Sequence, residues 1–401
     1  NYSLATKKLD NLIKASTQQR MFSDVSTGTF LSGGIDSSVI SLHLKDIDKH
    51  RMIAHNFSFK EKNFDEYEDA KKISNFLNIN IIKHNISIEE CFVEDFPKIV
   101  DAMDQPMSDT SFIATYYLSK LSVKKSKVVL SGDGSDEIFA GYSTFLADWI
   151  KRFIPNISFK YFIKLTNFFN IYEDSVYTKV GFKYKICKFL NSLHHKNLYA
   201  HILWREIFSL EEKKNIINNK LKKTINNEFL QHFDKLNEAV SKLHFLDRYM
   251  YIDIKTWLPN DILYKIDRST MANSQEARVP FLDSSLVEYV SSLPTNYKFS
   301  IFGRKKILKE TVSKLISKNF LKKKKSGFNS PIGIWLIENK NIKKMSFDLL
   351  NTRNMQKIFC KYKLKEIWDN HQNKKFDESF KIFNLMCFSQ WLENNNLKID
   401  I

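Results

Sequence analysis

The fold of this chain is decided by the stretch Gly28-Thr29-Phe30-Leu31-Ser32-Gly33-Gly34-Ile35-Asp36-Ser37-Ser38-Val39-Ile40. A short apolar run ends in Ser-Gly-Gly and a helix-compatible segment follows at once, which predicts a strand, a tight turn and a helix N-terminus. The paired glycines permit a positive φ and let a ligand approach the backbone closely. Because the first helical turn also leaves its N–H groups unpaired, the turn suits a bound phosphate.

Asp36 lies inside this glycine-rich turn, where its charge would repel a bare anion. A carboxylate at this place makes physical sense if it holds a cation that the phosphates share. The stretch is not a Walker loop, because no Gly-Lys-Ser/Thr closes it. Without a ligand, the same residues would form only a glycine turn between a strand and a helix.

The composition is that of a globular chain long enough for two domains. Apolar residues make up 43% of the 401 residues. No uncharged apolar run approaches the about 18 residues of a membrane span, so we expect no membrane association. The four cysteines form no CxxC pair, which indicates a reducing cytoplasm and argues against structural zinc. The N-terminus has neither the apolar core of a secretion signal nor an initiator Met, so we expect a cytoplasmic chain that is a fragment of something longer.

The formal net charge of +17 raises the question of a nucleic-acid partner. The lysines are scattered, however, and Lys, Asn, Ile and Phe are abundant together, which indicates a general compositional bias. We therefore do not expect nucleic acid to be the principal substrate.

Strand and helix patterns alternate through the first part of the chain. After the first strand we expect strands at 53–59, 79–86 and 127–130, and helices at 4–22, from 65 onward, and at 110–121. This alternation predicts a parallel, doubly wound α/β sheet, in which ligands bind at the carboxyl ends of the strands. From about Ser143 helical periodicity dominates, so we expect an α/β region at 1–142 and a mainly helical region at 143–401.

A second glycine-rich stretch, Leu130-Ser131-Gly132-Asp133-Gly134-Ser135-Asp136-Glu137-Ile138-Phe139-Ala140-Gly141-Tyr142, again follows a strand. Its three acids are costly to crowd together unless they coordinate a cation or orient a ligand. By itself the stretch would also suit an exposed acidic turn. Because both loops would follow strands of one sheet, we expect them to form two walls of a single ATP–Mg²⁺ site.

Two later stretches carry polar residues among apolar ones. Residues 247–283 hold many charges and include Glu276-Ala277-Arg278-Val279-Pro280-Phe281-Leu282-Asp283; either a reactive site or a structural ion-pair cluster would explain them. Lys325 directly precedes the turn Ser326-Gly327-Phe328-Asn329-Ser330-Pro331, from which it could reach into a cleft.

In this order the four stretches resemble the synthetase domain of glutamine-dependent asparagine synthetases, which has relatives in β-lactam, peptide and polysaccharide pathways. The shared patterns are Ser-Gly-Gly-x-Asp-Ser-Ser, Leu-Ser-Gly-Asp/Glu-Gly-x-Asp-Glu, Lys-x-Asp-Arg-x-x-Met, Glu-x-Arg-x-Pro-Phe-Leu-Asp and Lys-x-Gly-Phe-x-x-Pro. The similarity covers almost the whole chain and implies an adenine nucleotide α-hydrolase-like sheet. Lys323, where the family commonly has Arg, and Phe57-Ser58-Phe59, which lacks the usual glycine, depart from the pattern.

The resemblance also implies roles for individual residues. Lys325 would stabilise charge while an acyl-adenylate forms, Asp133 would lie near the activated acyl group, and Glu276 would lie beside the reaction centre. Asp36 and Asp136 would bind Mg²⁺. Phe30 and Phe57 would line the adenine pocket. The residues implied to bind ATP are Phe30, Ser32, Gly33, Gly34, Asp36, Ser37, Ser38, Phe57, Ser131 and Gly132.

The implied reaction amidates a carboxylate in two steps. The acid, expected to be aspartate, attacks the α-phosphate of ATP and releases pyrophosphate, and ammonia then converts the acyl-adenylate to an amide with release of AMP. In the family, a separate glutaminase domain with an N-terminal Cys makes the ammonia. This chain begins at Asn1 and its first cysteine is Cys91, so we expect the glutaminase domain to be absent from it. Either that domain was cut off or lost, which we favour, or a glutaminase partner or free ammonia supplies the nitrogen.

Three alternatives stay open at this point. The acid could be another carboxylate, as in peptide, lactam or polysaccharide pathways. A tRNA-modifying enzyme also uses a pyrophosphate loop, and a non-catalytic nucleotide-binding protein would keep the loop without turnover. A homodimer is likewise left open.

Overall fold

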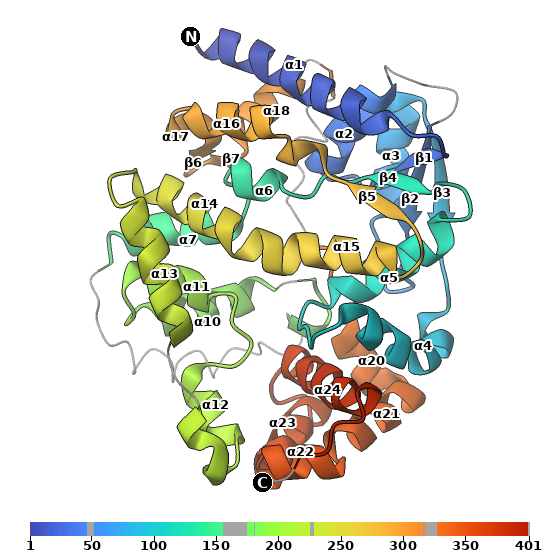
Figure 1. The fold of residues 1–401 in the computed structure, drawn as a ribbon, viewed down its shortest axis with the longest axis vertical. Helices are drawn as coiled ribbons and strands as arrows, with labels where there is room; N and C mark the ends of the chain where they lie inside the picture. The colour runs from blue at the N-terminus through green and yellow to red at the C-terminus, as the bar shows by residue number, and fades with distance from the viewer. Residues whose placement is uncertain are drawn as a thin grey trace. The chain divides into compact units, whose positions relative to one another are not determined.

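The computed structural model describes residues 1–45, 52–154, 175–179, 181–224, 228–313, 315–316 and 327–399 (Figure 1). These residues fall into two compact units, each assembled from three separate chain segments. The first unit comprises Asn1–Asn85, Thr115–Trp149 and Leu236–Lys325, and the second comprises Ile86–Ala114, Ile150–Lys235 and Ser326–Ile401. The predicted regions 1–142 and 143–401 follow the order of the chain, whereas these two units are defined by contacts between residues. The predicted boundary stays a prediction.

The first unit contains a five-stranded sheet in which every strand is parallel to its neighbours (Figure 1). The spatial order is β3-β2-β1-β4-β5, so the chain winds outward from β1 in one direction and then in the other. The strands are β1 Thr27–Phe30, β2 Ile53–Phe57, β3 Asn80–His84, β4 Val128–Leu130 and β5 Glu276–Arg278. The predicted doubly wound α/β fold is confirmed.

Two elements of this fold differ from the sequence pattern. The predicted strand at 53–59 ends at Phe57, and the strand at 79–86 is trimmed to Asn80–His84. β5 was not predicted at all, because Glu276-Ala277-Arg278 lacks the apolar or alternating pattern of a strand. As an edge strand it pairs only with β4.

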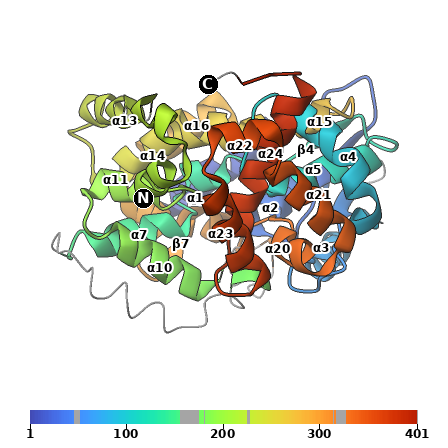
Figure 2. The ribbon, with the colours of Figure 1, turned by 90° about the horizontal axis from the view of Figure 1, so that it is seen from below.

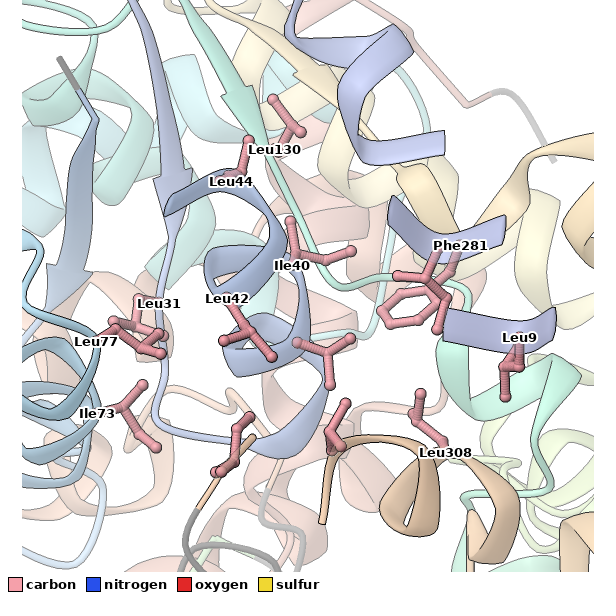
Figure 3. Close-up of a cluster of buried hydrophobic side chains, with 14 of the residues drawn as sticks. Leu9, Leu31, Ile40, Leu42, Leu44, Ile73, Leu77, Leu130, Phe281 and Leu308 are labelled. Atoms are coloured by element: carbon pink, nitrogen blue, oxygen red, sulfur yellow. The ribbon is translucent and has the colours of Figure 1, made fainter. Parts of the chain in front are cut away.

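The helix α2 lies at the centre of the hydrophobic core, since all of residues 37–44 are buried. A helix that is buried on every side must be packed by other elements all around it. The helices that pack against it are α1 (Tyr2–Met21) and α3 (Tyr67–Leu77), and α2 itself spans Ile35–Lys45. Figure 3 shows one group of side chains on one side of α2, Leu31, Ile73 and Leu77, and a second group on its other side, Leu9, Phe281 and Leu308.

Outside the sheet, the described residues of the first unit form helices and one short hairpin. The elements that lie wholly or partly in it are α5 Ser111–Ser122, α6 Ser135–Ile138, α7 Ser143–Lys151, α13 Glu228–Ala239, α14 Phe245–Lys255, the π-helical turn η2 Leu258–Leu263, α15 Tyr264–Met271, the 3₁₀ turn η3 Pro280–Leu282, α16 Ser284–Ser292, α17 Thr295–Lys298, the hairpin strands β6 Phe299–Ser300 and β7 Gly303–Arg304, and α18 Lys306–Val312.

The described part of the second unit is helical apart from one isolated bridge between Ile217 and Phe359, and α4, α20, α21 and α24 pack against one another in it (Figure 2). Aromatic rings fill its core: Phe92 lies 5.7 Å from Trp335 and Phe96 lies 6.4 Å from Phe383, measured between ring centroids. The helices are α4 Ile88–Met103, α10 Phe182–Ser192, α11 Asn197–Leu203, α12 Leu210–Ile216, the 3₁₀ turn η1 Asn219–Thr224, α20 Ile332–Glu338, α21 Lys340–Leu350, α22 Arg353–Ile358, α23 Lys361–Gln372 and α24 Ser379–Asn394. None of the helices in the described ranges is long and apolar enough to cross a membrane.

Candidate functional site

The loops that follow β1 and β4 meet at the topological switch point of the sheet, where open α/β sheets bind ligands. Gly132 of the second loop lies against the first turn of α2. A Cβ on Gly132 would come 2.8 Å from both the carbonyl carbon of Asp36 and the backbone nitrogen of Ser37. Because only glycine allows this approach, the structure explains how the two predicted walls come together.

The first loop is shaped by a glycine with a positive φ and by serine hydroxyls. Gly33 has a φ of +72°, and a Cβ there would come 2.6 Å from the carbonyl carbon of Asp69 in the first turn of α3. Ser38 Oγ donates a hydrogen bond to Gly34 O at 2.6 Å, and Ser37 Oγ donates to the same oxygen at 3.2 Å. The loop is therefore preformed above the N-terminus of α2, whose first N–H groups have no acceptor within the helix.

A lysine that the sequence did not single out lies at the centre of the site. Lys305 Nζ is 2.5 Å from Asp36 Oδ1 and 2.7 Å from Asp136 Oδ1. Ser135 Oγ donates to Asp36 Oδ1 at 2.7 Å and receives a hydrogen bond from Lys305 Nζ at 3.2 Å. Burial lowers the pKa of the Lys305 amine from its ordinary value, while the Asp36 carboxylate counters this by favouring the ammonium form.

Asp36 and Asp136, which were predicted to share a cation, both contact one positive group, the Lys305 ammonium. No cluster of three or more His, Cys, Asp or Glu side chains in the described part of the chain could hold a metal ion. Because Asp36 and Asp136 each direct one oxygen at the same positive group, these two carboxylates could hold Mg²⁺ only with phosphates and water completing the coordination, as is usual for this ion.

The backbone fixes Lys305 in this position. It precedes α18 and follows the hairpin of β6 and β7, in the left-handed conformation with φ +53° and ψ 39°. Arg304 Nη1 donates to Gly141 O at 3.2 Å, and a Cβ on Gly141 would collide with the side chains of Asp136 and Lys305. Gly141, which lies in the second glycine-rich stretch, therefore leaves the space that the side chains of Asp136 and Lys305 fill.

Glu137 is fully buried beneath the site. Tyr142 OH donates to Glu137 Oε1 at 2.5 Å. Burial raises the pKa of Glu137 to about 7, with smaller upward contributions from Asp253 and Asp133 that the Tyr142 hydrogen bond opposes. Asp133 accepts a hydrogen bond from Ser131 Oγ at 2.5 Å, which orients its carboxylate within the second loop.

The aromatic residues implied to line an adenine pocket are buried at the carboxyl ends of β1 and β2. Phe30 ends β1 and Phe57 ends β2. The Phe57 ring packs edge-on against Phe59 at 5.1 Å and stacks with Tyr117 at 6.4 Å, so its position is fixed by core packing. Contact of either ring with adenine stays a prediction.

One of the implied site residues, Glu276, is not brought into this arrangement. Glu276 is exposed at the amino end of β5, in register with Val128 at the amino end of β4, and it accepts a hydrogen bond from Arg278 Nε at 2.7 Å. The sheet loops of the site lie at the opposite ends of these strands. Lys325 lies outside the described residues, so its role stays a prediction.

Comparison with known proteins supplies a family. The family model described as asparagine synthase matches residues 8–393, nearly the whole chain. Glutamine-hydrolyzing asparagine synthetase 1 of Bacillus subtilis is 29% identical over 396 residues, covering 96% of this chain and 58% of the relative. A putative glutamine-hydrolyzing asparagine synthetase of Mycobacterium tuberculosis is 27% identical over 391 residues, covering 95% of this chain and 56% of the relative.

A more distant relative carries a different name. Amidase chyE of Penicillium rubens is 25% identical over 355 residues, covering 79% of this chain and 51% of the relative. This chain thus spans less than three-fifths of the length of each of these three curated relatives.

Proposed function

Because the chain belongs to the asparagine synthase family, we propose that it activates a carboxylate with ATP and then joins the activated acyl group to nitrogen. The observation that carries the proposal is the convergence of Asp36 and Asp136, from the loops after β1 and β4, on a single cation. A pair of carboxylates at a phosphate-binding turn suits a reaction in which pyrophosphate leaves from ATP.

Asp36 and Asp136 fit a magnesium ion. Mg²⁺ in nucleotide sites is bound by one or two carboxylates together with substrate phosphates, and here two carboxylate oxygens already point at one positive group. Neutralisation of the negative charge that builds up on the phosphates is the chemistry that a bound Mg²⁺ would supply.

The chain's own residues would bind and orient the nucleotide. The first turn of α2 would bind the pyrophosphate part of ATP through its backbone N–H groups and the hydroxyls of Ser32, Ser37 and Ser38. Gly132 and Asp133 would lie near the α-phosphate and the activated acyl group, with the Asp133 carboxylate oriented by Ser131, which would also contact ATP. Lys325 is proposed to stabilise charge on the adenylate.

We assign aspartate as the acid, since two of the three relatives are named asparagine synthetases. The amidase name of the third relative leaves another carboxylate as the competing assignment. Ammonia is the proposed nitrogen donor, either free or delivered by a glutaminase domain or subunit, and the cytoplasm is the proposed compartment because the described cysteines are free.

Exchange of labelled pyrophosphate into ATP tests the first step. We expect exchange that requires aspartate and Mg²⁺, that proceeds without ammonia, and that is abolished in Asp36→Asn. The matched control is Asp24→Asn, which removes an exposed carboxylate from the segment between α1 and β1. Exchange supported better by another acid would replace aspartate, and an absence of exchange with every acid tried would contradict adenylation.

A further inference from the structure

The ammonium of Lys305 occupies the place that a cation shared by Asp36 and Asp136 would take. Its Nζ lies within 2.7 Å of one oxygen from each carboxylate, and only 4% of the side chain is exposed. We propose that Lys305 is an internal counter-ion that competes with the divalent cation for these two carboxylates. The inference rests on the proposed metal role of Asp36 and Asp136.

The competition follows from charge and space. Mg²⁺ requires direct contact with its carboxylate oxygens at about 2.0–2.1 Å, so an ion bound to both Oδ1 atoms would meet the ammonium that both already contact. Two positive groups in a buried site repel each other strongly, because water screens them little. Lys305 must therefore withdraw before the metal binds both carboxylates.

The arrangement has a physical reason in the nucleotide-free protein. A half-buried carboxylate (Asp36) and a buried one (Asp136) that face each other without a counter-charge are costly. Lys305 removes this cost, and its left-handed backbone conformation and the close approach of Gly141 hold it in place. When a metal binds together with phosphates, the metal replaces the ammonium as the counter-ion of the carboxylates. The phosphate oxygens then become the counter-ions of the displaced ammonium. The metal should therefore bind weakly alone and more tightly with nucleotide.

A second buried lysine of the same unit provides a matched control. Lys298 Nζ contacts Asp247 Oδ1 at 2.9 Å, and its side chain is 2% exposed. It pairs with a single carboxylate outside the candidate site, so its removal also costs a buried ion pair but leaves no facing pair of carboxylates.

The test is thermal unfolding with increasing Mg²⁺ in the absence of nucleotide, together with Mn²⁺ binding followed by electron paramagnetic resonance. Lys305→Met should lower the Tm in chelator and recover it as Mg²⁺ is added. It should also bind Mn²⁺ at least about tenfold more tightly than the unaltered chain, because the competing state is removed. Lys298→Met should lower the Tm without gaining a response to either metal.

Each contrary result is distinguishable. If Lys305→Met and the unaltered chain bind Mn²⁺ equally, the competition is wrong and the metal site survives. If neither binds Mn²⁺ and neither is stabilised by Mg²⁺, the competition is wrong; if Mn²⁺ also fails to bind either chain in the presence of ATP, the proposed metal role is wrong as well. Should Lys305→Met not fold, Lys305→Gln, which keeps a hydrogen-bond donor, takes its place. Failure of both variants to fold in millimolar Mg²⁺ would also overturn the inference.

Discussion

Gly132 lies so close to Asp36 that a single added methyl group would come 2.8 Å from the Asp36 carbonyl carbon. This contact joins the loop after β4 to the first turn of α2. The spacing between the two loops, and with it the distance between Asp36 and Asp136, therefore depends on a position without a side chain.

Gly132→Ala should push the two loops apart. We expect a loss of stability of about 1–3 kcal/mol, typical of an overpacked site, and a larger fractional loss of pyrophosphate exchange. Urea unfolding and the exchange assay measure the two effects. Gly303→Ala is the control, because a Cβ there meets only Ser300 Oγ at 3.7 Å. Equal losses in the two variants would contradict the role of close approach.

Asp136→Asn should impair catalysis more than folding. Lys305 would keep its 2.5 Å contact with Asp36, so the buried ammonium would retain a counter-charge. Since metal-ion stabilisation of the phosphates contributes several kcal/mol to such reactions, we expect pyrophosphate exchange to fall by about two orders of magnitude. The control is Asp101→Asn, at an exposed position of α4. Exchange within about twofold of the unaltered chain would remove Asp136 from the metal site.

A buried histidine pair makes stability depend on pH. His55 Nδ1 lies 2.9 Å from His84 Nε2, and His55 Nε2 lies 2.8 Å from Ser126 Oγ. Burial, helped by His84, lowers the pKa of His55 from 6.5 to about 3. Below pH 6.5 the His55 imidazole therefore takes up a proton in the unfolded chain, whereas in the folded chain it stays neutral until the pH approaches 3. The associated stability is complete above pH 6.5 and decreases as the pH falls toward 3.

Urea unfolding at pH 7.5 and pH 5 checks this dependence. We expect the unaltered chain to lose about 2 kcal/mol from His55 over that interval, and His55→Gln to lose correspondingly less. His232→Gln, at an exposed position of α13, should behave like the unaltered chain. The same pH dependence in His55→Gln and in the unaltered chain would mean that His55 does not cause it.

The N-terminal helix should be part of the cooperative core. Leu9 of α1 is completely buried in the cluster around α2, whereas Leu4 of the same helix is 67% exposed. Leu9→Ala should therefore lower the free energy of unfolding by about 2–5 kcal/mol, and Leu4→Ala by no more than about 0.5 kcal/mol. Chemical denaturation measures both changes. A small effect of Leu9→Ala would show that α1 adds little to the fold.

The sequence predicted the parts of the fold whose signal is local. The strand, glycine turn and helix around Ser32 depend on neighbouring residues, and the second loop repeats that pattern. β5 escaped prediction because a short edge strand of Glu276, Ala277 and Arg278 carries no periodic apolar signal. Its strand geometry comes from pairing with β4, which is distant in sequence.

The role of Lys305 could not be predicted from the sequence for a related reason. Nothing in Gly303-Arg304-Lys305-Lys306 distinguishes this lysine from the many exposed ones. Its contact with Asp36 and Asp136 exists only after the β6–β7 hairpin and the left-handed turn place it there. The acidic half of the site is thus visible as a motif, while its basic half is a product of long-range folding.

The first unit is assembled from three separate segments of the chain, and this affects how it folds during synthesis. A ribosome releases β1 to β4 long before it has made β5 and Lys305, and at about 5–20 residues per second the delay is roughly 10–30 s. During that interval β4 is an open sheet edge, and Asp36 and Asp136 have not yet met their lysine. We therefore expect the nascent chain to be open to mispairing until residue 305 emerges, and its yield to depend on the speed of translation over residues 131–305.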